Sequence, residues 1–454
     1  MKGVTKLEDT SFAGKIEMSL ITTRTNCFIA PIIMLLIAFV GASAQAQVGG
    51  GGDEYWVDGP VDVRPGFPGS PDVDVDSAGR SVHVWSVGSG SSSGDIYMRR
   101  FDSDDVALID PVLVNTTSLS RILLPSIAVG NDDGFMVVWL SNEPDPAEGG
   151  INRQWIRGQA FNAAAAPVGP ERLISHLSLS PNGGEGAVTA LAGGGYVAAW
   201  RSDKSPGGDT TSIQARLIMA DGTPDGDQFQ ANEGPPAVNA NEYQEVVTGL
   251  ADGGFLVAWT GPELQGRTFD ADGTPRGGQF QINTDLEGAE FELDLALGDN
   301  GNVLAVWSDA ESPGNDNEIR GRVFVPDQST RGISPLGNDF RINSLILDDQ
   351  YEPAVANFGQ EGFLVAWTSN NSVGPDLDRG IQGRIVKADG TFGSAQAQLN
   401  LYLSTAESKP AASGRGGIAS VNWFASRNAE YNGGVIVARK WLGDTMFADG
   451  FEDL

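Results

Sequence analysis

The sequence predicts an all-β protein, a seven-bladed β-propeller built from four-stranded antiparallel blades. Two observations lead to this prediction. A tryptophan that ends an apolar run such as "FLVAW" occurs seven times, at Trp85, Trp139, Trp200, Trp259, Trp307, Trp367 and Trp423. Around each tryptophan, short runs of β-branched and aromatic residues alternate with turns rich in Gly, Asp and Asn, which is typical of strands joined by hairpins. Four strands per copy, with a period of roughly 50 residues, are typical of propeller blades.

Each copy shows the four expected strands in the same order. The first alternates and ends in a Gly-rich turn, as in "SIAVGNDDG" at 126–134, and the second is the run that ends in tryptophan. The third begins like "IRGRVF" at 319–324, and the fourth ends in Asn, as in "QFQIN" at 279–283. The second strand is apolar on both faces, so it must be buried on both sides, as it is between two blades. An open solenoid is the alternative, but it would need a capping unit at each end, and none is visible.

The last copy predicts how the ring closes. Its third strand, within "VIVARKWLGDTMF", is followed by no full fourth strand, whereas "YWVD" at 55–58 precedes the first copy in fourth-strand position. We therefore expect the N-terminal segment to complete the last blade. The predicted organisation is a signal peptide (1–46), a Gly-rich linker (47–53), the propeller (54–442) and a C-terminal tail (443–454).

The N-terminus reads as a secretory signal peptide. A basic start precedes an apolar run, Phe28–Val40, and small residues follow, with cleavage expected after Ala44 or Ala46. The run is shorter than the about 20 residues of a membrane span. Met18 is an alternative start. The single cysteine, Cys27, precedes the apolar run, so we expect a mature chain without disulfides. The protein is expected to be secreted or held at the cell surface, with no membrane span after cleavage.

The chain is acidic, with 29 Lys and Arg against 59 Asp and Glu and a net charge of −30. Such a surface repels nucleic acid and anionic lipid, so neither is an expected partner. It suits a cation or a neutral glycan, but solubility outside the cell is the preferred explanation of the charge. We expect a monomer whose partner is an extracellular glycan or protein.

Two motifs carry a resemblance to bacterial proteins. The repeat resembles the "DGGFVVxW…IxGQRFDxDGxxxGxxFxVN" units of large secreted and surface proteins of Gram-negative bacteria, and the likeness covers residues 65–442. Such repeats are assigned to adhesion and matrix roles where a role is given, so the resemblance implies an extracellular location and this architecture more than a chemistry. The tail "GDTMFADGFEDL" is similar to a "GDxIFxDGFE" ending on exported proteins of some gammaproteobacteria. A sorting or processing signal is one interpretation of this ending, and the resemblance leaves its role open.

Two residue types recur in nearly every copy. The tryptophans could stack on sugar rings, but we expect them to pack between blades because each lies in a fully apolar strand. Third-strand arginines recur at Arg99, Arg216, Arg267, Arg322, Arg384 and Arg439, with Gln159 in the second copy. Converging arginines would capture an anion. Third strands lie away from a propeller axis, however, so we expect each arginine to bridge strands or to pair with a carboxylate.

Calcium is the one cofactor that the sequence suggests. Asp72, Asp74 and Asp76 resemble a calcium loop, which needs closely spaced oxygen ligands. The alternation with valine is instead typical of a first strand beside the channel. The "DADG" turn at 270–273 and the "KADG" turn at 387–390 are expected to be hairpin turns whose glycines adopt positive φ.

Catalytic signals are few. His83 and His176 are the only histidines, so no multi-histidine metal site can form, and His83 lies within a second strand, where a packed role is expected. The S-x-D-x-G-x-x-W Asp box of sialidases is absent. Carboxylates are abundant enough for a glycosidase pair, but abundance does not give geometry.

The connections between second and third strands are long, polar and different in each copy, except for "TGPELQ" in the fourth. They must share one face of the disk, and binding sites commonly lie on such loops. The candidate ligand contacts are Asp203, Asp309, Asp316, Glu318 and Asp376. We therefore expect a secreted, non-enzymatic propeller that binds a glycan or protein through this face. The alternatives are a carboxylate-dependent hydrolase or lyase acting on glycans, and a surface scaffold.

Overall fold

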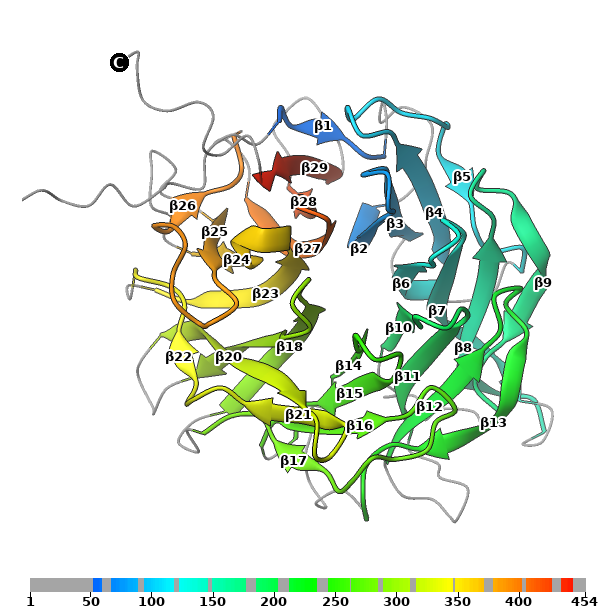
Figure 1. Ribbon diagram of the computed structural model, residues 1–454. Helices are drawn as coiled ribbons and strands as arrows, with labels where there is room; N and C mark the ends of the chain where they lie inside the picture. The colour runs from blue at the N-terminus through cyan, green and yellow to red at the C-terminus, as the bar shows by residue number, and fades with distance from the viewer. Residues whose placement is uncertain are drawn as a thin grey trace, which may run out of the picture. The chain divides into compact units, whose positions relative to one another are not determined.

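The structure of the chain is a computed structural model. Its seven sheets form a ring, which confirms the predicted all-β, seven-bladed propeller (Figure 1). The described residues belong to one compact unit, Gln45–Leu454. They are 52–58, 67–88, 94–117, 122–145, 149–176, 185–202, 212–234, 244–261, 263–284, 289–310, 316–345, 348–370, 379–401, 406–426 and 434–443. Within these ranges no helix is long and apolar enough to cross a membrane.

The blades follow the chain, and the first strand of each lies innermost. Blade one contains β2 (Phe67–Val75), β3 (Ser81–Gly88), β4 (Gly94–Phe101) and β5 (Val112–Leu113), and blade two contains β6 (Ile122–Val129), β7 (Phe135–Asp145), β8 (Ile151–Phe161) and β9 (Pro167–Leu173). Blade three contains β10 (Gly186–Ala190), β11 (Tyr196–Ser202), β12 (Ser212–Ile218) and β13 (Pro224–Gln230), and blade four contains β14 (Glu245–Gly249), β15 (Phe255–Trp259), β16 (Gln265–Phe269) and β17 (Phe280–Gln281). Blade five contains β18 (Ala289–Leu297), β19 (Val303–Ala310), β20 (Asn317–Asp327), β21 (Gly332–Pro335) and β22 (Phe340–Arg341). Blade six contains β23 (Gln350–Asn357), β24 (Phe363–Ser369), β25 (Gly380–Val386) and β26 (Ala397–Gln398), with the 3₁₀ turn η3 (Gly359–Glu361) between β23 and β24.

Blade seven is built from both ends of the chain. It contains β27 (Glu407–Arg415), β28 (Ile418–Ala425) and β29 (Val435–Leu442), and β1 (Tyr55–Trp56) pairs with β29 as the outermost strand. Tyr55 lies opposite Ala438, and Val57 donates its N–H to the Ile436 carbonyl at 2.9 Å. Closing the ring in this way covers an otherwise open sheet edge. The segment expected to pair here extended to Val63, but residues 59–66 lie outside the described residues.

The core consists of apolar clusters that each join two neighbouring blades. Seven such clusters follow one another around the ring, and the last joins blade seven to blade one. All seven repeat tryptophans are buried, the most accessible being Trp259 at 3%. Truncating a buried tryptophan to alanine costs about 3–5 kcal/mol. The tryptophans therefore bind blade to blade, and their rings are not available to stack on a sugar.

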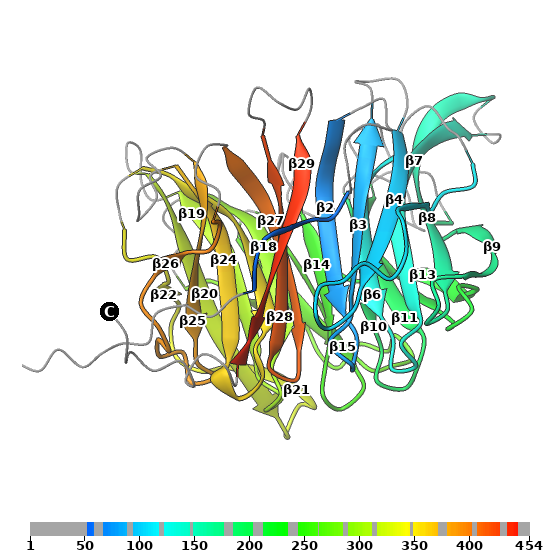
Figure 2. The ribbon, with the colours of Figure 1, turned by 90° about the horizontal axis from the view of Figure 1, so that it is seen from above.

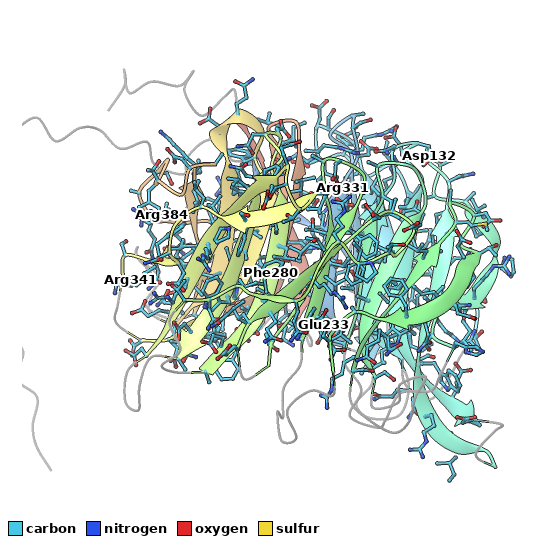
Figure 3. The ribbon with its side chains drawn as sticks, turned by 60° about the horizontal axis from the view of Figure 1, so that its bottom comes forward. Asp132, Glu233, Phe280, Arg331, Arg341 and Arg384 are labelled. Carbon is cyan, nitrogen blue, oxygen red and sulfur yellow. The ribbon has the colours of Figure 1, made fainter. Side chains whose placement is uncertain are left out.

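The third-strand arginines form a second contact between blades. In six blades the guanidinium Nη1 donates to the carbonyl of the residue that directly follows the outermost strand of the preceding blade. For example, Arg384 donates to Ile342 O and Arg322 donates to Ile282 O, each at 2.8 Å. The others are Arg99 to Val57, Arg216 to Ile174, Arg267 to Ala231 and Arg439 to Leu399. These arginines bridge strands, and Figure 3 shows Arg384 at the outer side of the ring.

The asparagine at the end of the fourth strand has a local function. The Asn283 side-chain oxygen accepts a hydrogen bond from the backbone N–H of Leu264 at 3.2 Å, where the third strand begins, and Asn400 does the same for Ile381 at 2.9 Å. Equivalent bonds link Asn115 to Ile96, Asn232 to Ile213 and Asn343 to Ile319. The recurrent Asn thus satisfies a buried backbone donor, which explains why it repeats.

Candidate functional site

A cavity of about 720 Å³ lies on the ring axis. It is lined by the starts of the first strands, so it opens on the face that carries the connections between second and third strands. In the edge-on view of Figure 2 the β7–β8 hairpin projects from this face. Six carboxylates line the cavity, together with the two cations Arg201 and Lys409: Asp72, Glu185, Glu245, Glu292, Asp294 and Glu352. Their convergence makes the cavity the candidate functional site.

In five blades a β-bulge shapes the cavity wall. Two residues of the first strand lie opposite the blade tryptophan, and the first of them has positive φ: Ser70 (46°), Leu124 (54°), Glu292 (54°), Glu352 (54°) and Lys409 (54°). Non-glycine residues rarely adopt this conformation, and bulges often lie next to active sites. Blades three and four lack the bulge, and there Gly186 and Glu245 alone lie opposite Trp200 and Trp259.

Two of the bulge residues form a hydrogen-bonded chain across three blades. Glu292 Oε2 accepts from the backbone N–H of Glu352 at 2.5 Å and from the Ser308 hydroxyl at 2.8 Å. Glu352 Oε2 repeats the pattern with the Lys409 N–H at 2.8 Å and the Thr368 hydroxyl at 2.9 Å. Each carboxylate is therefore fixed through one oxygen, and among the described residues its second oxygen forms no side-chain or backbone hydrogen bond.

Glu185 and Glu245 form a different arrangement at the junction of blades three and four. Glu185 lines the cavity with an exposed side chain. Desolvation by the surrounding cavity wall raises its pKa, the charge of Lys409 lowers it, and the charge of Glu292 raises it. Burial raises the pKa of Glu245 well above its usual value, and the charge of Glu185 raises it further. The Arg201 backbone N–H and charge act in the opposite direction. Even so, neither Glu245 oxygen has a hydrogen-bond partner of normal geometry among the described residues.

The aspartates at the suggested calcium site have separate partners. Asp72 Oδ2 accepts from the Ile127 N–H at 2.9 Å, and Asp74 Oδ2 accepts from the Val129 N–H at 2.6 Å, so both satisfy the inner edge of the next blade. Asp76 forms ion pairs with Arg80 and Arg100 at 2.6 and 2.7 Å. Across the residues with described positions, no three His, Cys, Asp or Glu side chains are grouped to hold a metal.

The two hairpin turns expected from the sequence contain glycines at positive φ. Gly273 and Gly390 each have a φ of 83°. In the first turn, Asp272 Oδ1 accepts from the Thr274 N–H at 2.9 Å, and Asp389 does the same for Thr391 in the second. The aspartate oxygens therefore brace the turn backbone.

The structure places three of the candidate loop residues in the β19–β20 hairpin of blade five, where Asp309 lies directly opposite Glu318. Asp309 is 2% exposed and forms an ion pair with Arg320 at 3.3 Å, and Glu318, also buried, accepts from the Asn343 amide. Asp316 is exposed and accepts from the Asp348 N–H at 2.7 Å. Asp203 and Asp376 lie outside the described residues. None of the three described residues lines the axial cavity.

His83 is a buried structural histidine. Its Nδ1 faces the Asn422 side-chain amide at 3.1 Å, and its Nε2 lies 3.0 Å from the Ser81 hydroxyl and 3.3 Å from that of Tyr55. Burial lowers its pKa to about 3, so the ring is neutral near pH 7. The amide donates to Nδ1, and the proton on Nε2 is shared with the hydroxyls. This network joins blades seven and one, away from the cavity.

Comparisons with known proteins support the fold. No family model and no curated protein matches the chain. An ulvan lyase, described as a new polysaccharide lyase family, PL25, matches with a TM-score of 0.55 and 8% identity, over 85% of this chain and 95% of that one. The same lyase bound to -[GlcA(1-4)Rha3S]- gives 0.54. A protein of unknown function from Dyadobacter fermentans gives 0.51 at 10% identity, over 86% and 98% of the two chains. This chain is therefore similar to them in fold.

Proposed function

We propose that the protein is a glycan hydrolase acting in the axial cavity, with Glu185 as proton donor and Glu292 as the partner carboxylate. The observation that carries this proposal is the convergence of carboxylates from blades three, five and six on one cavity of ligand size. Glycoside hydrolysis commonly uses two carboxyl groups, one protonated and one ionised. The fold shared with a polysaccharide lyase gives further support.

The environments of the two residues fit these roles. Glu185 is accessible from the channel and has a raised pKa, which favours the protonated form needed to donate to a leaving oxygen. Glu292 is held through Oε2 by a backbone N–H and a hydroxyl, which orients Oε1 for attack on the sugar or for activation of a water. Their charges interact, because ionised Glu292 raises the pKa of Glu185.

Hydrolysis fits the cavity better than elimination from a uronate. A lyase of that kind must neutralise a substrate carboxylate, whereas this cavity presents six carboxylates against Lys409 and Arg201. Its described lining contains no histidine or tyrosine to act as a base. We therefore propose a neutral glycan as the substrate. Export, expected from the leader, would place the protein where such polysaccharides occur.

The test is turnover of neutral polysaccharides by the purified protein, measured as new reducing ends. We expect Glu185→Gln and Glu292→Gln each to lower kcat by about a hundredfold to ten-thousandfold, the usual contribution of an acid–base group. Glu233→Gln is the matched control, because Glu233 follows the outer strand of blade three, pairs with Arg267 of blade four at 2.8 Å and does not line the cavity. Binding without turnover would favour the non-enzymatic hypothesis, and an unsaturated product would favour a lyase.

A further inference from the structure

Glu245 is an exception to the repeat at a buried position. In the other blades the corresponding first-strand residue, opposite the blade tryptophan, is apolar: Pro71, Pro125, Gly186, Leu293, Pro353 and Pro410. Glu245 is 3% exposed, and within the described structure neither carboxyl oxygen has a hydrogen-bond partner of normal geometry. A buried carboxyl without partners destabilises a fold. Since six blades fold with an apolar residue here, the architecture does not require Glu245.

Blade four also differs at the mouth above Glu245. Trp259 lies opposite Gln265, so five residues form the connection between its second and third strands. Eleven residues separate Trp85 from Tyr97 in blade one, and 17 separate Trp139 from Arg157 in blade two. Blades three and four are also the two without the first-strand bulge. The wall of the cavity therefore departs most from the pattern of the other blades where Glu245 lies.

The residues around Glu245 define what we call the blade 3–4 recess: Glu185, Arg201, Gln244, Glu245 and Thr260, all of which line the cavity. Gln244 and Thr260 are hydrogen-bonded: the Gln244 N–H donates to the Thr260 hydroxyl at 2.8 Å. The recess thus has a braced wall beside the Glu245 carboxyl group, which is buried and has unused hydrogen-bonding capacity. A carboxyl can both accept from and donate to hydroxyl groups.

We propose that the blade 3–4 recess is a sugar-binding subsite in which the Glu245 carboxyl hydrogen-bonds adjacent hydroxyl groups of a neutral sugar. This inference rests on the proposed function and names the part of the cavity that recognises the substrate. Sugar hydroxyls supply the donors and acceptors that Glu245 lacks in the protein. The group acts in binding, and the reaction is left to Glu185 and Glu292.

The test is calorimetric binding of cellotetraose, xylotetraose, mannotetraose and laminaritetraose to the Glu292→Gln variant, in which turnover is suppressed. Adding Glu245→Met, which restores an apolar residue, should weaken the tightest-binding tetrasaccharide at least tenfold and raise the Tm. Adding Glu245→Gln, which keeps a donor and an acceptor, should leave the affinity within threefold. Glu233→Met is the control for the same exchange outside the cavity and should leave the affinity within threefold.

Several results would overturn the subsite. These are no binding of any neutral tetrasaccharide, equal affinity after Glu245→Met, and binding of a glucosamine tetramer alone, which would assign the recess to an ammonium group. The binding readout separates this inference from the hydrolase proposal. Glu245-dependent binding by a protein that cleaves no glycan leaves the subsite standing and rejects hydrolysis. If the protein cleaves a glycan but Glu245→Met changes neither the affinity nor KM, the hydrolase proposal stands and the subsite is rejected.

Discussion

Replacing Asp294 should change how stability depends on pH. Its Oδ2 accepts from the Val355 N–H of the next blade and its Oδ1 from the Leu295 N–H, each at 2.8 Å. Burial on the channel wall raises its pKa to about 7. A folded-state pKa above the unfolded value of about 3.9 means that the folded state binds the extra proton between those two values. Its contribution to stability is therefore complete below about pH 4 and is lost as the pH rises to about 7.

The magnitude follows from the size of the shift. Three pH units at about 1.4 kcal/mol each make an upper limit of about 4 kcal/mol between pH 4 and pH 8. Asp294→Asn has no such titration, but its amide leaves one of the two backbone donors without an acceptor, which costs about 1–3 kcal/mol at every pH. The variant should thus be less stable than the wild type at pH 4.5 and should approach or exceed it at pH 8.

Urea unfolding followed by tryptophan fluorescence at pH 4.5, 6 and 8 measures both effects. Burial raises the pKa of Asp72 to about 6. The Asp72→Asn variant should therefore change the pH dependence of stability in the same direction. Asp327 provides a control of opposite sign. The Ser329 hydroxyl and backbone N–H hold its pKa below the usual range, so its contribution is lost as the pH falls. An Asp294→Asn variant with the pH slope of the wild type would refute the reasoning.

Three further predictions concern the architecture, and unfolding free energies check each of them. Deleting residues 1–66 removes β1 and should lower the free energy of unfolding markedly, because it exposes the edge of β29. An unchanged free energy of unfolding would show that another segment closes the ring. Arg384→Met removes two hydrogen bonds, to Ile342 O and Ser394 O, and should cost about 3 kcal/mol, whereas a loss below about 1 kcal/mol would show that the contact between blades is dispensable. Trp307→Ala should cost about 3–5 kcal/mol and leave the other blades folded, unless the ring unfolds as a single unit.

The sequence predicts the ring well because its signals are local and repeated. Seven copies of an apolar run ending in tryptophan specify the buried second strands, and the missing fourth strand of the last copy points to Tyr55–Trp56. The bridging arginines also follow from the pattern, because their distance from the axis is a property of third strands. None of these inferences depends on how blades far apart in the chain face one another.

The cavity is harder to predict because it depends on ring closure. Glu185 and Glu292 are more than a hundred residues apart, and only the closed ring brings them to one mouth. The bulges insert a single residue, which a pattern of alternation hides. The sequence nevertheless contains a signal of the bulge, because Glu352 and Lys409 each precede a proline at the same place in their copies. Aligning the copies there would also have singled out Glu245.

Exceptions to the repeat are informative because the repeated contacts are redundant. Blade two has Gln159 where six blades have the bridging arginine, yet its tryptophan is fully buried and its apolar clusters persist. A propeller therefore tolerates the loss of one contact in one blade. An exception that only removes a contact calls for no function. Glu245 instead adds a destabilising group, at a cavity wall where the bulge is also missing, and this coincidence makes the junction of blades three and four the first place to look for a bound sugar.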